Sequence, residues 1–128
     1  MKTQILIGDD KEKVRTSLAR ALGARGLETE AVNTPGEVIT RARAKKYAVV
    51  ITDLNYTHEG TEGYDVLRQL KDIPALKILY TGQMGFECAA EAFGLGADYI
   101  VLRKDESQLM EVLNTAIQEA TKKVGEVK

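Results

Sequence analysis

Three aspartates and a threonine stand where short apolar runs of this chain end. Asp9 and Asp10 follow one run, Asp53 ends a second, and Thr81 ends a third. If these runs are parallel strands of one sheet, their carboxyl ends lie together and the four side chains share one crevice. Carboxylates in such a crevice repel one another and are partly desolvated, a conflict that a hard divalent cation such as Mg2+ removes.

The same groups suit the transfer of a phosphoryl group. Mg2+ commonly takes one or two carboxylates together with a phosphate oxygen. The hydroxyl of Thr81 could donate to a second phosphate oxygen, and Lys104, which follows a further apolar run, could pair with the phosphate as a point charge. Once these charges are balanced, one free carboxylate becomes a nucleophile able to form an aspartyl-phosphate.

Alternating strand and helix patterns predict how these residues are positioned. Four apolar runs have the composition of strands, at residues 4–8, 47–53, 76–81 and 99–102, and residues 27–32, where Glu28 and Glu30 alternate with other residues, are expected to form an edge strand. A helical spacing of apolar residues follows each run, as in Val14, Leu18 and Leu22 after the first. Alternation of this kind predicts an α/β fold with a parallel sheet, right-handed crossovers and helices on both faces.

Composition narrows the class of protein. The 128 residues fit one domain, and a net charge of −1 favours neither nucleic acid nor an anionic membrane as a partner. No apolar stretch is long enough to span a membrane. The single cysteine, Cys88, excludes an internal disulfide and fits a reducing cytoplasm. We expect Cys88 to pack within an apolar helix that Phe86 and Phe93 help to mark.

Four motifs in order resemble the receiver domain of two-component response regulators. They read ILIGDD from residue 5, ITDLN from residue 51, ILYTG from residue 78 and LGADY from residue 95. The resemblance covers nearly the whole chain, with residues 1–122 as the receiver domain and residues 123–128 as a frayed tail. It implies a flavodoxin-like (βα)5 three-layer sandwich whose five-stranded parallel sheet has the order 2-1-3-4-5.

The resemblance also implies a role for each site residue. Asp53 is the phosphoacceptor, and Thr81 binds the phosphoryl group. Mg2+ is held by Asp9, Asp10, Asp53 and the main-chain carbonyl of Asn55. A sensor histidine kinase or phosphotransfer protein is the donor, and the domain catalyses only its own phosphorylation and dephosphorylation.

Two departures from the family pattern affect these assignments. The loop after Asp53 lacks the usual proline and is about two residues longer before Gly63. Counted without gaps from Thr81, the family's lysine position falls on Arg103. With one residue inserted upstream it falls on Lys104, which we favour as the residue that pairs with phosphate.

The same insertion leaves open whether Tyr99 or Ile100 is the switch residue of the fifth strand. We expect Tyr99, rather than Ile100, to swing inward when Thr81 closes on phosphate. The face made by the fourth helix, fifth strand and last helix would then be the switch surface for a downstream protein or a self-dimer.

Two other functions compete with this interpretation. The stretch DLNYT from Asp53 resembles the nucleophile motif of haloacid-dehalogenase-like phosphatases, but Asn55 replaces the aspartate that acts as their general acid. A pseudo-receiver that binds partners without phosphorylation is the second alternative, favoured by the unusual loop. Asp9 and Asp10 could also simply cap a helix, and we expect His58 to be a surface residue.

Overall fold

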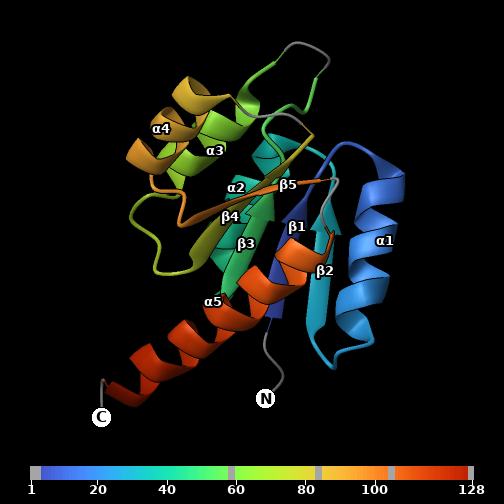
Figure 1. Cartoon of the computed structure of the whole chain (residues 1–128), viewed down its shortest axis with the longest axis vertical. Helices are drawn as coiled ribbons and strands as arrows, with labels where there is room; N and C mark the ends of the chain where they lie inside the picture. Colours follow the sequence, from blue (N-terminus) through green and yellow to red (C-terminus); the bar gives the residue numbers. More distant parts are fainter. Residues whose placement is uncertain (1–3, 58–59, 83–84, 104–105, 127–128) are drawn as a thin grey trace.

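The structure, a computed structural model, describes residues 4–57, 60–82, 85–103 and 106–126, apart from the side chains of residue 106 and residues 120–126. Strands and helices alternate along it (Figure 1). The elements are β1 (Gln4–Gly8), α1 (Glu12–Gly23), β2 (Glu28–Val32), α2 (Pro35–Ala44), β3 (Val49–Thr52), α3 (Glu62–Gln69), β4 (Leu76–Thr81), α4 (Phe86–Gly94), β5 (Tyr99–Leu102) and α5 (Glu106–Glu126).

The five strands form one parallel sheet in the order β2-β1-β3-β4-β5, which confirms the predicted flavodoxin-like topology. Its register aligns the strand ends that carry the site. Gly8 at the end of β1 pairs with Thr52 at the end of β3. Thr81 at the end of β4 pairs with Leu102 at the end of β5. The polar residues that follow these strands therefore emerge at one edge of the sheet.

Successive residues of each strand point to opposite faces, so the core has two sides. Ile5 and Ile7 of β1 pack with α1 and α5 on one side, in a cluster that includes Leu18 and Leu113. Leu6 points to the other side, where residues of α2 and α3 cover it. A third cluster lies between α3, α4 and the strands β4 and β5. Figure 1 shows the resulting three layers.

Helix α4 differs from the expectation that its apolar residues are packed. All of its residues are described, and only Ala92 is buried. Phe86 is 90% exposed, Phe93 is 52% exposed, and Cys88 is also exposed. The expectation that Cys88 is a packed residue was wrong, because the buried side of α4 is formed by Ala92 and Cys88 does not lie on it.

Two further findings concern the ends of elements. Thr34 caps α2 as its sequence predicts, accepting a hydrogen bond from the amide of Glu37 at 3.2 Å, with Pro35 at the first helical position. Helix α5 runs to Glu126 and so includes residues 123–126 of the expected tail, whereas residues 127–128 lie outside the described part. Within the described residues, no helix has both the length and the apolar character of a membrane span.

Edge strand β2 is tied to its neighbours by Glu30. The carboxylate of Glu30 accepts hydrogen bonds from Arg41 at 3.0 Å and from the Tyr47 hydroxyl at 2.7 Å, and it pairs with Lys45. These partners, Lys45 first, lower the pKa of Glu30 to about 2. Because Arg41 lies in α2 and Lys45 directly follows that helix, the cluster fastens the end of α2 and the residues before β3 to the sheet edge.

We predict that Glu30→Gln destabilises the fold at pH 7 by on the order of 1 kcal/mol, since the cluster is partly exposed to solvent. The folded pKa of Glu30 is lowered, so its stabilisation is present above the unfolded pKa and is lost as the pH falls through the folded value. The difference from wild type should therefore shrink between about pH 4.5 and pH 2. Urea unfolding at several pH values measures it, with exposed Glu28→Gln on the same strand as the control. A loss that is independent of pH would contradict this.

Candidate functional site

Asp9 and Asp53 lie beside each other, buried, at the carboxyl edge of the sheet. Their exposed fractions are 2% and 1%, whereas Asp10 is exposed. One carboxylate oxygen from each of the three aspartates lies within 4.8 Å of the others. The structure thus brings together the three carboxylates that the sequence placed at the strand ends.

Asp9 uses its two carboxylate oxygens differently. Oδ1 accepts a hydrogen bond from the amide of Lys11 at 2.9 Å, and the Asp9 carbonyl accepts one from Arg15 at 2.8 Å. The Lys11 bond holds the turn before α1, but Lys11 is the N-cap residue and no side chain caps that helix, so the capping alternative is wrong. Oδ2 of Asp9 points into the site. Burial raises the pKa of Asp9 to about 6; the Lys11 amide lowers it, and nearby Asp53 raises it further.

Asp53 is oriented by the backbone that follows it. Its Oδ1 accepts hydrogen bonds from the amide of Leu54 at 2.8 Å and the amide of Asn55 at 3.4 Å. Its Oδ2 is buried and receives no hydrogen bond. One oxygen of Asp53 is thereby fixed, while the other keeps its lone pairs available for a cation or an electrophile.

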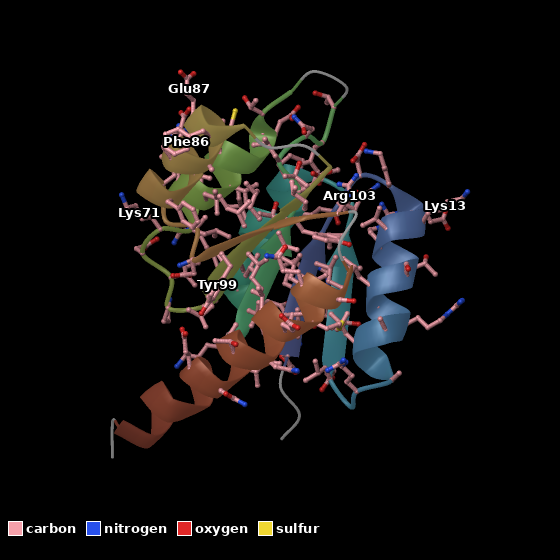
Figure 2. The ribbon with its side chains drawn as sticks, viewed as in Figure 1. Lys13, Lys71, Phe86, Glu87, Tyr99 and Arg103 are labelled. Carbon is pink, nitrogen blue, oxygen red and sulfur yellow. The ribbon has the colours of Figure 1, made fainter. Side chains whose placement is uncertain are left out.

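Arg103 supplies the positive charge in this crevice. Its Nη2 donates to Asp9 Oδ2 at 3.1 Å and lies 2.9 Å from Asp53 Oδ2, an ion pair in which the N–H is not directed at the oxygen. The Arg103 amide donates to the Thr81 carbonyl at 2.7 Å, and the Tyr80 hydroxyl donates to the Arg103 carbonyl at 3.0 Å. Figure 2 shows Arg103 at the edge of the sheet beside the start of α1.

Thr81 pairs with Leu102, so Arg103 is the first residue after β5. Arg103, which we considered but did not favour, lies in the site, and Lys104 lies outside the described residues. No part of the chain that the structure describes requires the inserted residue on which the preference for Lys104 depended.

Thr81 is buried, and its hydroxyl has no hydrogen-bond partner. It shares the α3–α4 side of the sheet with Leu79, whose partner on β5 is Ile100; Leu102, which pairs with Thr81, follows on the same side of β5. Tyr99 packs on the opposite side, where its hydroxyl donates to Glu119 of α5 at 2.6 Å. That bond raises the pKa of Tyr99 to about 12. Tyr99 and Thr81 therefore face opposite sides of the sheet.

The long loop after Asp53 is held by its own side chains. Glu62 accepts hydrogen bonds from the amide of Tyr56 at 3.2 Å and the hydroxyl of Thr57 at 2.6 Å. The side-chain amide of Asn55 donates to the carbonyl of Gly60. These contacts hold the loop, which lacks the proline usual in the family. Sequence reasoning did not identify Glu62. His58 lies outside the described residues.

Gly63 closes this loop against the acceptor strand. Its amide donates to the Leu54 carbonyl at 2.8 Å. A Cβ atom at this position would lie 2.3 Å from the Asp53 carbonyl oxygen and 2.5 Å from Leu54 Cα. Because both neighbours are backbone atoms, only glycine allows α3 to begin this close to Asp53.

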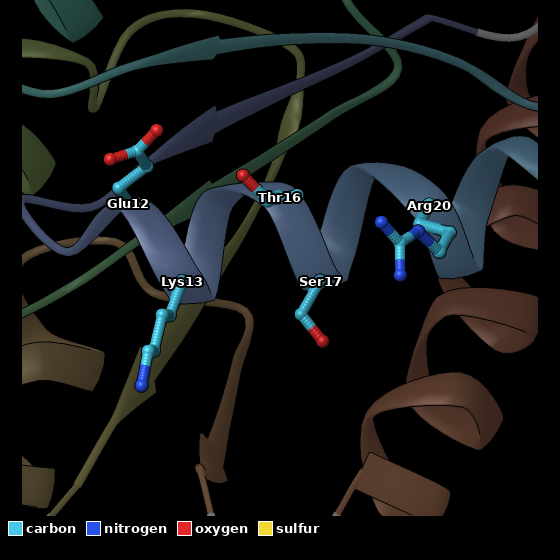
Figure 3. Close-up of a pocket in the computed structure, with 5 residues that line it drawn as sticks. All are labelled: Glu12, Lys13, Thr16, Ser17 and Arg20. Carbon is cyan, nitrogen blue, oxygen red and sulfur yellow. The ribbon is translucent and has the colours of Figure 1, made fainter.

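Two hollows of the described surface differ in their relation to the carboxylate crevice. One of about 380 Å³ is lined by residues of α1 alone, as Figure 3 shows. A groove of about 210 Å³ adjoins the site. It is lined by Lys13, Val14, Ser17, Leu18, Tyr80 and Arg103. The first hollow contains none of the aspartates and does not bear on the chemistry.

The residues present fit a divalent cation. Three carboxylates offer oxygen ligands within reach of one centre, the donor set that Mg2+ and Ca2+ prefer. The buried Asp53 Oδ2, which lacks a hydrogen bond, is the kind of orphaned atom that a cation satisfies.

Comparison with known proteins agrees with the fold and the crevice. The sequence matches the family model of the response regulator receiver domain over residues 5–125. It is 32% identical over 112 residues to the photosynthetic apparatus regulatory protein RegA of Rhodobacter capsulatus, an alignment that covers 85% of this chain and 60% of that protein. The chain thus spans about 60% of the length of the curated relatives it matches.

Solved structures give the same result. A CheY-like receiver domain protein of Methanospirillum hungatei has a TM-score of 0.87 at 25% identity, covering 96% of this chain and 99% of that one. A response regulator of Burkholderia pseudomallei, whose crystal structure contains a phosphorylated aspartic acid, a calcium ion and citrate, has a TM-score of 0.78 at 25% identity. The match covers 98% of this chain and 75% of that one.

This chain belongs to the response regulator receiver domain family. It is a signalling domain of the two-component type and not a classical enzyme. None of these comparisons supports the phosphatase alternative.

We predict that Gly63→Ala destabilises the fold by about 2–4 kcal/mol, because the new methyl group meets backbone atoms of Asp53 and Leu54 that cannot move aside cheaply. Gly94→Ala is the matched control, since a Cβ there has no neighbour within 4 Å. Denaturant unfolding of both variants measures the effect. Equal stability of the two variants would show that the close approach at Asp53 is not a constraint.

Proposed function

We propose that Asp53 accepts a phosphoryl group from a sensor histidine kinase or a phosphotransfer protein. The observation that carries the proposal is its carboxylate: Oδ1 is fixed by backbone amides, and Oδ2 is buried without a hydrogen bond. Asp9 and Asp10, with the main-chain carbonyl of Asn55, are the residues that would hold Mg2+ with Asp53. The phosphorylated aspartic acid in the Burkholderia pseudomallei relative supports the chemistry.

The transfer is a displacement at phosphorus. A lone pair of Asp53 Oδ2 forms the new O–P bond while the P–N bond of a phosphohistidine breaks, and its electron pair returns to the imidazole, which takes up a proton. Bound Mg2+ would neutralise charge on the carboxylates and on the phosphoryl oxygens. The amides of Leu54 and Asn55 hold the carboxylate in one orientation, so the attacking oxygen is already positioned.

Two groups are placed to bind the phosphoryl oxygens. The buried Thr81 hydroxyl has no partner and can donate to one of them. We assign the cationic role to Arg103 instead of Lys104, because its guanidinium already lies 2.9 Å from the Asp53 oxygen that would carry the phosphoryl group. Arginine pairs with phosphate through two parallel hydrogen bonds, which lysine cannot do.

We further propose that α4, β5 and α5 form the surface that binds a downstream protein or a second copy. Phe86 and Phe93 expose large apolar side chains on α4, and Figure 2 shows Phe86 and Glu87 projecting outward from that helix. Because α4 buries only Ala92, few packing contacts hold it in place. The Tyr64 hydroxyl donates to the Cys88 carbonyl at 3.3 Å and so links α3 to α4.

Tyr99 and Glu119 lie on the β5–α5 part of this surface, joined by their hydrogen bond. Tyr99 would therefore respond to phosphorylation through α5, because it does not share the Thr81 side of the sheet. Ile100 and Leu102 are the β5 residues on the Thr81 side of the sheet, and they are the ones we expect to respond to movement of Thr81 itself.

We predict that a small phosphodonor with Mg2+ increases the intact mass of the wild-type protein by one phosphoryl group and leaves Asp53→Asn unchanged, because the amide cannot serve as the nucleophile. Asp9→Asn and Asp10→Asn should slow the reaction through weaker Mg2+ binding. Asp65→Asn, an exposed aspartate of α3, is the control. A full mass gain in Asp53→Asn would exclude it as the acceptor, and no gain in wild type would favour a pseudo-receiver.

The surface is tested separately with beryllofluoride and Mg2+, which mimic the phosphoryl group. Amide NMR signals of α4 and those around Tyr99 should shift in wild type and stay in place in Asp53→Asn. Shifts confined to the neighbours of Asp53, with α4 and β5 silent, would contradict the proposed surface while leaving the acceptor assignment intact.

A further inference from the structure

We infer that Glu62 is a positioning residue for the metal site, because it orients the peptide whose carbonyl is the proposed main-chain ligand. The inference rests on the proposed function, in which the Asn55 carbonyl binds Mg2+ together with the aspartates. It concerns the lengthened loop after Asp53, and it assigns a role to a side chain that the sequence pattern did not single out.

The peptide between Asn55 and Tyr56 is held through its N–H group. Glu62 Oε1 accepts a hydrogen bond from the Tyr56 amide at 3.2 Å. This peptide bond is trans, so its carbonyl, which belongs to Asn55, points away from its N–H. A carboxylate that fixes the direction of the N–H therefore also fixes the direction in which the Asn55 oxygen is offered to a cation.

The Glu62 carboxylate is itself held in place. Its Oε2 accepts a hydrogen bond from the Thr57 hydroxyl at 2.6 Å, so both of its oxygens are bound to the same loop. The Thr57 hydroxyl first, and the Tyr56 amide as a smaller cause, hold the pKa of Glu62 below its usual range. Glu62 is therefore charged at neutral pH, and hydrogen bonds to a charged acceptor are stronger than those between neutral groups.

Tyr56, which donates to Glu62, is also fixed at its other end. Its ring is buried in the cluster that α2 and α3 form against the sheet, and its hydroxyl oxygen lies 2.7 Å from Thr52 Oγ1. A Cβ atom on Gly8 would lie 2.3 Å from that hydroxyl oxygen, so the glycine leaves the room that the ring occupies. With its ring fixed in the core and its amide fixed by Glu62, Tyr56 leaves the preceding peptide little freedom to rotate.

Gly60 provides the space in which the Glu62 carboxylate lies. A Cβ atom at Gly60 would lie 2.2 Å from Glu62 Oε1 and 2.2 Å from Thr57 Oγ1. Both atoms are at the ends of side chains that can move, and the φ angle of Gly60 is not positive. Gly60→Ala should therefore displace the Glu62 carboxylate from the Tyr56 amide without removing it and without unfolding the chain.

The experiment measures the Mg2+ affinity of the unphosphorylated protein by titration of amide NMR signals. Glu62→Ala should bind Mg2+ about tenfold more weakly, the lower end of what loss of a residue that orients a metal ligand costs. Gly60→Ala should weaken binding in the same direction. Glu62→Gln keeps an oxygen for the Tyr56 amide and should stay closer to wild type. The matched controls, which should bind as wild type does, are Glu87→Ala in the first turn of α4 and Gly94→Ala, where a Cβ has no neighbour within 4 Å.

Wild-type affinity in Glu62→Ala or in Gly60→Ala would overturn the inference. Equal weakening in Glu62→Gln and Glu62→Ala would also overturn it, because the charge of Glu62 and not its orienting hydrogen bond would then be responsible.

A second measurement, on the wild-type protein, covers variants that do not fold. The carbonyl carbon signal of Asn55 should shift during the Mg2+ titration with the same midpoint as the amides around Asp53. A carbonyl signal that stays in place while those amides shift would overturn the inference and leave the aspartates as ligands. Absence of any Mg2+ binding by wild type would overturn the proposed metal site as well. The titrations contain no phosphodonor, so they do not depend on whether Asp53 is the acceptor.

Discussion

Two carboxylates buried side by side are the constraint on which the rest of this structure depends. Asp9 and Asp53 are almost inaccessible to solvent and repel one another, so the fold requires a cation between them. Arg103 is positioned for that task by its amide, which bonds β4, and by its carbonyl, which accepts from Tyr80. The repulsion between these carboxylates lowers the stability of the fold. The same carboxylates make the crevice suitable for a divalent metal and for a phosphoryl group.

The fold and the carboxylate cluster could be predicted because they depend only on the spacing of apolar residues and on the order of strands and helices along the chain. Short runs of four to seven residues alternating with helical spacing define parallel strands, and parallel strands bring their carboxyl ends together. The proximity of Asp9, Asp10 and Asp53 can be predicted from that geometry without knowledge of any side-chain contact. Sheet order is different: it required the family resemblance, since alternation does not say which strand lies next to which.

What the sequence did not determine was which residues of β5 face the site. Successive strand residues point to opposite sides of a sheet, and the pattern alone does not say whether Tyr99 or Ile100 lies on the Thr81 side. Helix α4 was misjudged for another reason. Its composition is apolar, but it touches the sheet mainly through Ala92, and composition does not report which side of a helix is covered. Glu62 could have been noticed as an acid placed to fasten a lengthened loop.

The contact between Arg103 and Asp9 joins residues 94 positions apart. A chain leaving the ribosome therefore places Asp9 and Asp53 at the edge of a partly formed sheet long before β5 is available to bring the guanidinium. Until β5 pairs with β4, burial of these acids has no compensating cation, so the central strands gain stability late and together with the last one. This couples the two ends of the chain in folding, and it makes the strand that completes the sheet also the strand that completes the site.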